Sequence, residues 1–446
     1  MKLLRRVSYA MLILAVSNSF LLYYLVPIIS GWKVAMCAAL AIAFIGINIM
    51  PSATGCPKGR YRVLLGGTEL LLLFMLSSLL NLAGVILTYI LLVPENVKLS
   101  VLFINCLIII VFEAIVFWNG IIRVYCTSVQ LGIKIRVIGI LVGWIPIANI
   151  VALIKIYTIT TRECAVEIKK VRINEVRRES EICKTKYPLL LVHGVFFRDM
   201  KYLNYWGRIP AELKANGANI FYGKQQSAAS VKNSAEEILE RIKYITNKTG
   251  CEKVNIIAHS KGGLDARYAI SCLGADEVVA SLTTINTPHR GCIFAEYLLN
   301  KAPEKLKNSL ANRYNQALKK LGDQSPHFLA AVNDLTASRC SEINAVATDC
   351  DSVFYQSVSS KSNNVRSGKF PLNISYPLVQ HFDGANDGLV SVESAKWGTK
   401  FNLICVTGKR GVTHADVIDL NRENIDGFDV REFYVQLVGE LKSMGF

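Results

Sequence analysis

The 446-residue sequence lacks the closely spaced cysteine and histidine sets that hold metals or cycle between thiol and disulfide. Twelve cysteines are present, but no two stand in a CxxC pair, so a zinc ribbon and a thioredoxin-like redox motif are excluded. The cysteines are also too sparse to indicate a disulfide framework. Internal repeats are absent too, which excludes a solenoid or a propeller.

Histidine and acidic residues are scarce in the first part of the chain. All six histidines follow residue 187, and residues 1–187 hold 20 lysines and arginines against 8 acidic residues. The formal charge of +16 does not indicate a nucleic-acid partner, because these basic residues flank apolar runs. There they set the orientation in a membrane and contact anionic lipid. We therefore expect a membrane region followed by a soluble domain.

Long apolar runs dominate residues 1–158, for which we predict an α-helical transmembrane region of about five helices. The expected spans cover residues 7–30, 34–50, 64–93, 99–122 and 136–157. Two carboxylates, Glu69 and Glu113, lie in or near these runs, too few for a transport pathway. A transporter or sensor, in which the C-terminal domain is regulatory, stays an alternative.

Basic residues recur at the N-terminus and in every second short loop of this region. The positive-inside rule makes those loops cytoplasmic, and five crossings then put the C-terminal domain of this cell-membrane protein outside the cytoplasm. The segment from Gly143 to Pro146 interrupts the fifth run, so a re-entrant hairpin that returns the domain to the cytoplasm is the alternative. Residues 159–186 are expected to form a charged helical stalk.

Short apolar runs alternate with helical patterns from residue 187 onward. Largely apolar runs, such as 188–192, 254–258 and 278–285, are typical of strands that are buried on both faces. An amphipathic helix is expected over 235–245. The pattern predicts an α/β domain over 187–446 with a mostly parallel sheet covered by helices.

One of these runs breaks at Ser260 and turns at once into a helix, which is the pattern of a nucleophile elbow. The turn needs small residues on both sides of the serine, and Ala258 and Gly262 meet that need. The backbone N–H of Lys261 would then point at the reacting oxygen and stabilise an oxyanion. An ordinary strand-to-helix turn is the alternative.

A serine nucleophile needs a base and an acid that orients it, and elbow hydrolases place both later in the chain. After the acid candidates only His414 remains as the base. Asp387 is preferred as the acid over Asp383, partly because of the resemblance described below, although either could form an Asx turn. His259 is expected to be a packing residue.

The second oxyanion donor is expected in the turn that follows the first strand. Gly194 allows a close backbone approach there. The Val195 N–H is the preferred donor, with that of Phe196 second.

Five short motifs stand in a fixed order along this domain. They are Leu191–Gly194, Ala258–Gly263, Thr287–Gly291, Asn386–Val390 and His414–Asp416. Together they resemble bacterial triacylglycerol lipases of the α/β-hydrolase superfamily, over about residues 187–446. The resemblance implies an ester hydrolase that acts on lipid at an interface through an acyl-enzyme on Ser260. It also implies a helical lid, here residues 292–335.

The resemblance further implies a calcium ion held by an aspartate two residues after the histidine. Asp416 matches, but residues 367–372 lack the expected partner aspartate, so no cofactor is expected and Asp416 stays a weak calcium candidate. The Lys261 side chain departs from the pattern, and a cation there is expected to favour anionic headgroups.

The sequence thus predicts a membrane-anchored serine ester hydrolase with Ser260, Asp387 and His414 as the catalytic residues. Lipid or ester substrates and the membrane are the expected partners. A phospholipase or an acyltransferase with the same triad is the alternative enzyme.

Overall fold

A computed structural model of the chain describes residues 2–25, 30–52, 59–92, 98–195 and 204–446. The chain divides into two compact units, one up to Ile173 and one from Asn174. The division falls inside a single long helix, α7 (Ala148–Arg177). Much of the predicted stalk is therefore a continuation of this helix.

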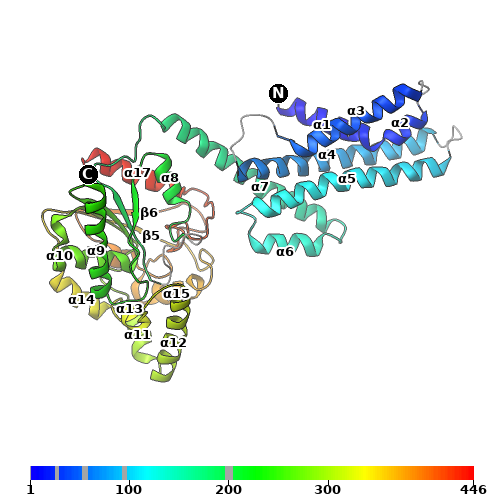
Figure 1. Ribbon diagram of the computed structural model, residues 1–446. Helices are drawn as coiled ribbons and strands as arrows, with labels where there is room; N and C mark the ends of the chain where they lie inside the picture. The colour runs from blue at the N-terminus through cyan, green and yellow to red at the C-terminus, as the bar shows by residue number, and fades with distance from the viewer. Residues whose placement is uncertain (1, 26–29, 53–58, 93–97, 196–203) are drawn as a thin grey trace. The chain divides into compact units, whose positions relative to one another are not determined.

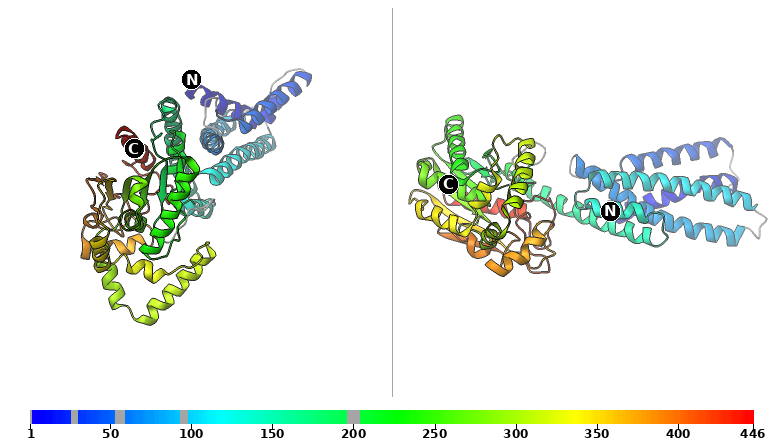
Figure 2. Two further views of the ribbon diagram at one scale, coloured as in Figure 1. Left: turned by 60° about the vertical axis from the view of Figure 1, so that its left-hand side comes forward. Right: turned by 90° about the horizontal axis from the view of Figure 1, so that it is seen from below.

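The first unit is entirely helical in its described residues. Besides the start of α7, it comprises α1 (Lys2–Ser17), α2 (Ser19–Leu25), α3 (Ser30–Ile49), α4 (Arg60–Leu92), α5 (Leu99–Thr127) and α6 (Gly132–Val142). Among the described residues, α3, α4 and α5 are long and apolar enough to cross a membrane. α1 and α2 would add a fourth crossing, bent by 63°. Figure 2 shows α4 and α5 running side by side.

The predicted fifth span over 136–157 is wrong, because two helices replace it. α6 ends at Val142, and α7 begins only at Ala148, after a break that contains Pro146. The helices then fold back on each other: a Cβ placed on Gly139 of α6 would lie 3.1 Å from the Ile156 side chain of α7. The apolar composition of residues 136–157 resembles that of a membrane span, but the chain reverses its direction at the break.

The second unit is built on one six-stranded sheet. Its strands are β1 (Leu189–Val192), β2 (Ile220–Tyr222), β3 (Val254–His259), β4 (Val279–Ile285), β5 (Phe354–Ser360) and β6 (Lys400–Ile404). Their order is β2-β1-β3-β4-β5-β6, and every neighbouring pair is parallel. The predicted α/β fold with a parallel sheet is confirmed, and a strand ending at Ser260 lies inside the sheet, as in an α/β-hydrolase.

Both faces of the sheet are covered by helices (Figure 1). Side chains alternate along each strand, so Leu189 and Leu191 of β1 pack towards α8 (Ile209–Ala215) and α17 (Val430–Ser443). Leu190 and Val192 pack towards α9 (Val231–Thr249) and α10 (Lys261–Leu273). Burial on both faces of the sheet explains why the strand sequences are largely apolar.

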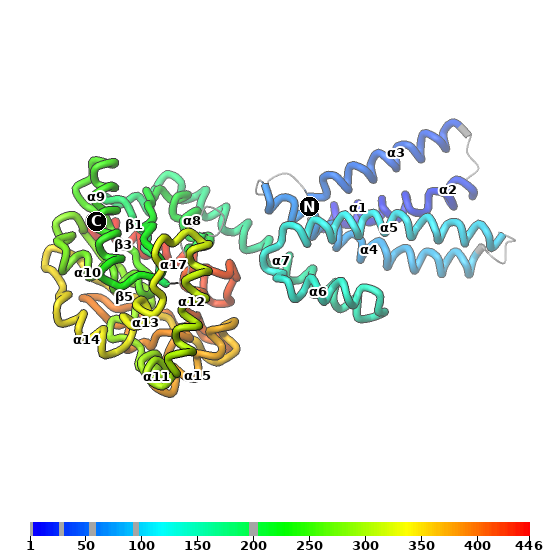
Figure 3. Tube along the Cα trace, turned by 60° about the horizontal axis from the view of Figure 1, so that its bottom comes forward, coloured from blue at the N-terminus to red at the C-terminus, as the bar shows by residue number. Residues whose placement is uncertain are grey.

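The long connection between β4 and β5 is helical. This connection forms α11 (Ile293–Lys301), α12 (Glu304–Lys320), α13 (Phe328–Asn333) and α14 (Ala337–Val346). A short 3₁₀ helix, η1 (Ala275–Glu277), precedes β4. α15 (Leu372–Asp383) and α16 (Val392–Ala395) follow β5. α11 lies beside α15, where the Tyr297 and Phe382 rings are 4.9 Å apart (Figure 3).

Candidate active site

Ser260 stands at the corner between β3 and α10 in a backbone conformation that side chains rarely adopt. Its φ is 56° and its ψ is −132°. Such strain persists only where surrounding structure enforces it, and it clusters at functional sites. A Cβ placed on Gly194 would lie 2.7 Å from the Ser260 Cβ, so glycine is needed for the turn after β1 to approach the serine.

His414 and Asp387 form a short polar contact near this corner. The Asp387 Oδ2 lies 2.6 Å from the His414 Nδ1, and the His414 backbone N–H donates to the Asp387 carbonyl oxygen at 2.9 Å. The other carboxylate oxygen accepts the backbone N–H groups of Leu389 and Val390 at 2.8 and 2.7 Å. Asp387 is fully buried, so these bonds fix both the carboxylate and the imidazole.

The competing carboxylate, Asp383, serves a different element. It accepts the backbone N–H groups of Ile293 and Phe294 at 3.2 and 3.4 Å, at the start of α11. These N–H groups have no partner inside the helix, so Asp383 caps it. Partial burial raises the pKa of the Asp383 carboxyl above its usual range. Of the two sequence candidates, only Asp387 contacts His414.

His414 lies against the residue that precedes the serine. The ring centroids of His414 and His259 are 4.4 Å apart. Among the described residues, no hydrogen bond joins the Ser260 hydroxyl to the His414 ring. Catalytic hydrogen bonds are often long without substrate and shorten when it binds, so this separation is compatible with general-base catalysis.

His259 has a more specific place than the packing role expected from the sequence. Its Nδ1 lies 2.6 Å from the Tyr205 hydroxyl, which also accepts the Gly194 N–H at 3.0 Å. Tyr205 therefore ties the turn after β1 to the elbow strand. The Gly194 N–H is engaged, which leaves Val195 as the next donor in that turn, while Phe196 lies outside the described residues. Tyr205 was not found from the sequence, because nothing local marks it.

The Lys261 side chain does not face the substrate side, so the expected attraction of anionic headgroups is wrong. It is 2% exposed, and its Nζ lies 2.6 Å from the Asp265 carboxylate and 3.1 Å from the Ser234 hydroxyl. Burial raises the pKa of Asp265 to about 7, although the Lys261 ammonium opposes this rise. Lys261 is also the first residue of α10, where backbone N–H groups lack intrahelical partners.

Asp416 does not present the free carboxylate that a calcium ion needs. Its Oδ1 accepts from the Arg410 guanidinium at 2.9 Å, and its Oδ2 accepts the Thr413 backbone N–H at 3.0 Å. Among the described residues, no group of three or more His, Cys, Asp or Glu side chains is placed to hold a metal. The residues around Asp416 therefore do not fit calcium.

Two buried histidines make the stability of the second unit sensitive to acid. Burial is the main cause that holds the pKa of His259 and His289 well below 6.5. As the pH falls through 6.5, the unfolded chain binds protons that the folded chain does not. Each histidine then lowers the free energy of unfolding by up to about 1.4 kcal/mol per pH unit. We expect His259→Gln to flatten the fall of Tm between pH 7 and 5.5.

Thermal denaturation over this pH range, with His381→Gln as control, tests that expectation. His381 is exposed, so its replacement should leave the slope as in the wild type. Equal slopes for His259→Gln and the wild type would contradict the assignment of His259 as a neutral buried imidazole.

Known proteins resemble part of the chain. A sequence family described as "Putative serine esterase (DUF676)" matches residues 211–357. A triacylglycerol lipase of Pseudarthrobacter phenanthrenivorans is 34% identical over 173 residues, which are 36% of this chain and 53% of that lipase. Triacylglycerol lipase 2 of Saccharomyces cerevisiae is 27% identical over 273 residues, 56% of this chain and 78% of that lipase.

Among solved structures, Bacillus licheniformis lipase BlEst2 in mature form covers 57% of this chain and 92% of its own, with a TM-score of 0.43 and 18% identity. The chain spans about half the length of the bacterial lipase of Pseudarthrobacter phenanthrenivorans that it matches. The second unit has a parallel sheet of the α/β-hydrolase type, and the sequence resembles triacylglycerol lipases.

Proposed function

We propose that the chain is a membrane-anchored serine ester hydrolase of the triacylglycerol lipase or carboxylesterase type. The observation that carries the proposal is the 2.6 Å contact between Asp387 and His414, beside a serine held at φ 56°. A strained serine, an oriented imidazole and a buried carboxylate are the parts of acyl transfer through a covalent enzyme intermediate.

In the proposed reaction, the Ser260 oxygen attacks the ester carbonyl carbon and His414 takes the hydroxyl proton. Asp387 keeps the imidazole oriented and stabilises its positive charge. The Val195 and Lys261 N–H groups donate to the oxyanion. His414 then gives its proton to the leaving alcohol, which departs and leaves the acyl group on Ser260. Water, deprotonated by His414, then attacks this ester, and His414 returns the proton to the Ser260 oxygen as the acid is released.

Exposed apolar side chains on the helices after β4 support a lipid substrate. On α12, the side chains of Leu306, Leu310 and Tyr314 stand at a spacing of four residues and are exposed, whereas Ala311 and Leu318 pack inward. α11 and α15 expose further apolar residues, including Ile293, Tyr297, Leu298, Ile374 and Leu378. A cluster of this kind is typical of surfaces that meet lipid, and it supports a lid over about residues 292–335.

Purified full-length protein in detergent, given p-nitrophenyl esters of increasing chain length, tests the proposal. We expect a burst of p-nitrophenol close to one per chain, followed by steady release of fatty acid. Partition of the acyl group to an added alcohol or lysophospholipid in preference to water would favour an acyltransferase. Preferred cleavage of phospholipid would favour a phospholipase. Absence of all turnover contradicts the enzymatic function.

The alternative of a transporter or sensor draws on polar contacts within the first unit. Glu113 accepts from Ser78 at 3.1 Å and from Asn81 at 2.8 Å. Asn81 in turn accepts from Ser17 and Asn18, so α1, α4 and α5 are joined through polar side chains. Such contacts also hold membrane helices together, and solute flux that survives loss of Ser260 would be needed to favour transport.

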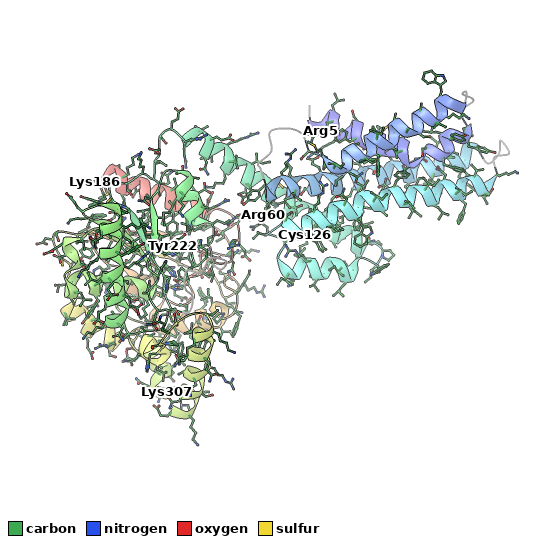
Figure 4. All side chains as sticks on the ribbon, in the orientation of Figure 1. Arg5, Arg60, Cys126, Lys186, Tyr222 and Lys307 are labelled. Atoms are coloured by element: carbon green, nitrogen blue, oxygen red, sulfur yellow. The ribbon has the colours of Figure 1, made fainter. Side chains whose placement is uncertain are left out.

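Basic side chains gather at one end of the first unit, which bears on its orientation. Figure 4 labels Arg5, Arg60 and Cys126 at this end, where α1 and α4 begin and α5 finishes. α7 returns to it: Glu163 accepts from the Ser128 hydroxyl at 2.6 Å and lies 4.0 Å from the Arg60 guanidinium. The chain therefore leaves the first unit at its basic end.

This exit supports a cytoplasmic second unit, the reverse of the orientation expected from five crossings. Up to four crossings are available in the described residues, and the hairpin of α6 and α7 begins and finishes at the end where α5 finishes. By the positive-inside rule the basic end faces the cytoplasm. The sequence alternative of a returning hairpin is thus the orientation that we propose.

Labelling of intact cells with a membrane-impermeant maleimide tests this orientation. Cys405 is an exposed cysteine of the second unit, and we expect it to react only after the membrane is permeabilised. Lys98→Cys, at the opposite end of α5, is the matched control and should react without permeabilisation. Labelling of Cys405 on intact cells would place the second unit outside.

A further inference from the structure

The loop that carries His414 is held on one side by the segment after β5. The Val412 N–H donates to the Lys361 carbonyl at 2.9 Å, and the Asn363 N–H donates to the Arg410 carbonyl at 3.1 Å. The Asn363 side chain adds a bond to the Gly408 carbonyl at 2.7 Å. These backbone contacts fix where the loop starts, but they do not reach its far end.

A guanidinium holds the far end of the loop. Nη2 of Arg410 lies 2.9 Å from the Asp416 carboxylate and 2.9 Å from that of Glu423. Lys369 pairs with Glu423 and completes the cluster. Asp416 is only 4% exposed, whereas the Arg410 side chain is 34% exposed, so water screens the contact from the guanidinium side only.

The cluster is linked to the imidazole by a short path. The second oxygen of Asp416 accepts the Thr413 N–H at 3.0 Å, and Thr413 directly precedes His414. Through this bond, the position of the Asp416 carboxylate sets the backbone from which the imidazole extends towards Asp387. One cation between two carboxylates is the arrangement that a bound divalent ion would create. Here the cation is a side chain.

We propose that Arg410 is a positioning residue that holds the His414 loop through Asp416 and takes the place of a bridging metal ion, so that hydrolysis needs no calcium. The inference rests on the proposed function, since it concerns how the proposed base is held. The guanidinium, at 2.9 Å from each carboxylate, repels a second cation from the same place.

The calcium dependence of the wild type and the kinetics of variants at position 410 test the proposal. In the wild type, ester hydrolysis and Tm should be unchanged by a chelator or by millimolar calcium. Arg410→Gln should lower kcat by about 10- to 100-fold with little change in KM, because a displaced base loses rate but not binding. Arg410→Lys, which keeps the charge, should restore part of kcat. Lys409→Gln, exposed on the same loop, is the matched control and should behave as the wild type.

An exchange of the cation gives the sharpest test. Arg410→Asp gathers three carboxylates, including those of Asp416 and Glu423, and should be inactive with chelator but recover activity and Tm with calcium. The proposal is overturned by calcium dependence of the wild type, by equal kcat in Arg410→Gln and Lys409→Gln, or by no response of Arg410→Asp to calcium.

Failure of the proposed function has a different signature. The wild type would then neither hydrolyse esters nor react with a fluorophosphonate. In that case, calcium titrations followed by Tm still report on the Arg410 cluster: a calcium-dependent Tm for Arg410→Asp alone supports it, and one for the wild type overturns it.

Discussion

Replacement of Ser260 by alanine should lower kcat for ester hydrolysis by about 10⁴- to 10⁶-fold, the loss that follows removal of a serine nucleophile. The hydroxyl oxygen is the only heavy atom that this substitution removes. Alanine keeps the Cβ, which the elbow already accommodates at φ 56°. The fold should therefore be intact, with Tm close to that of the wild type. Hydrolysis by Ser260→Ala at more than a few per cent of the wild-type rate would contradict the role of Ser260.

Ser260→Gly separates activity from strain at the same position. Glycine adopts a positive φ without penalty, so this variant should be inactive yet more stable by about 1 kcal/mol. Thermal denaturation beside the activity assay measures both effects. An unchanged or lower Tm would mean that the elbow stores no strain.

The second large effect is expected from Asp387→Asn, which should lower kcat by about 10⁴-fold with little change in KM. An amide in place of the carboxylate favours the wrong tautomer of His414 and no longer stabilises its positive charge.

Asp383→Asn is the matched control, because it makes the same change four residues earlier. Asp383 caps α11, so the variant should lose about 1 kcal/mol of stability at most and keep kcat within a few fold. If Asp383→Asn were the inactive variant and Asp387→Asn the active one, the assignment of the acid would have to be reversed.

The parts of the fold and of the site that depend on short stretches of the chain could be predicted from the sequence. β3 and the elbow follow from the largely apolar stretch 254–258 before Ser260 and from the small residues around the serine, and the parallel sheet follows from similar stretches. The polar turn directly before Leu389 and Val390, together with the family resemblance, favoured Asp387 over Asp383, and the structure places Asp387 against His414. The spacing of four residues between Lys261 and Asp265, which form a buried ion pair, is also visible in the sequence.

Other features depend on contacts between distant residues and left no local pattern. Tyr205 acts on His259 across 54 positions, and Arg410 is one basic residue among many until Asp416 and Glu423 fold around it. The reversal between α6 and α7 is marked in the sequence only by the interruption from Gly143 to Pro146, because hydropathy does not distinguish one crossing from two apolar helices. That single difference inverts the expected side of the membrane.

The most direct test of the central claim is to locate the adduct of a fluorophosphonate on the full-length protein by peptide mass spectrometry. We expect one adduct per chain, on Ser260, with hydrolysis lost in proportion to labelling and with labelling slowed at least 100-fold in His414→Ala. An adduct on another residue, or full hydrolysis after Ser260 is modified, would contradict the account.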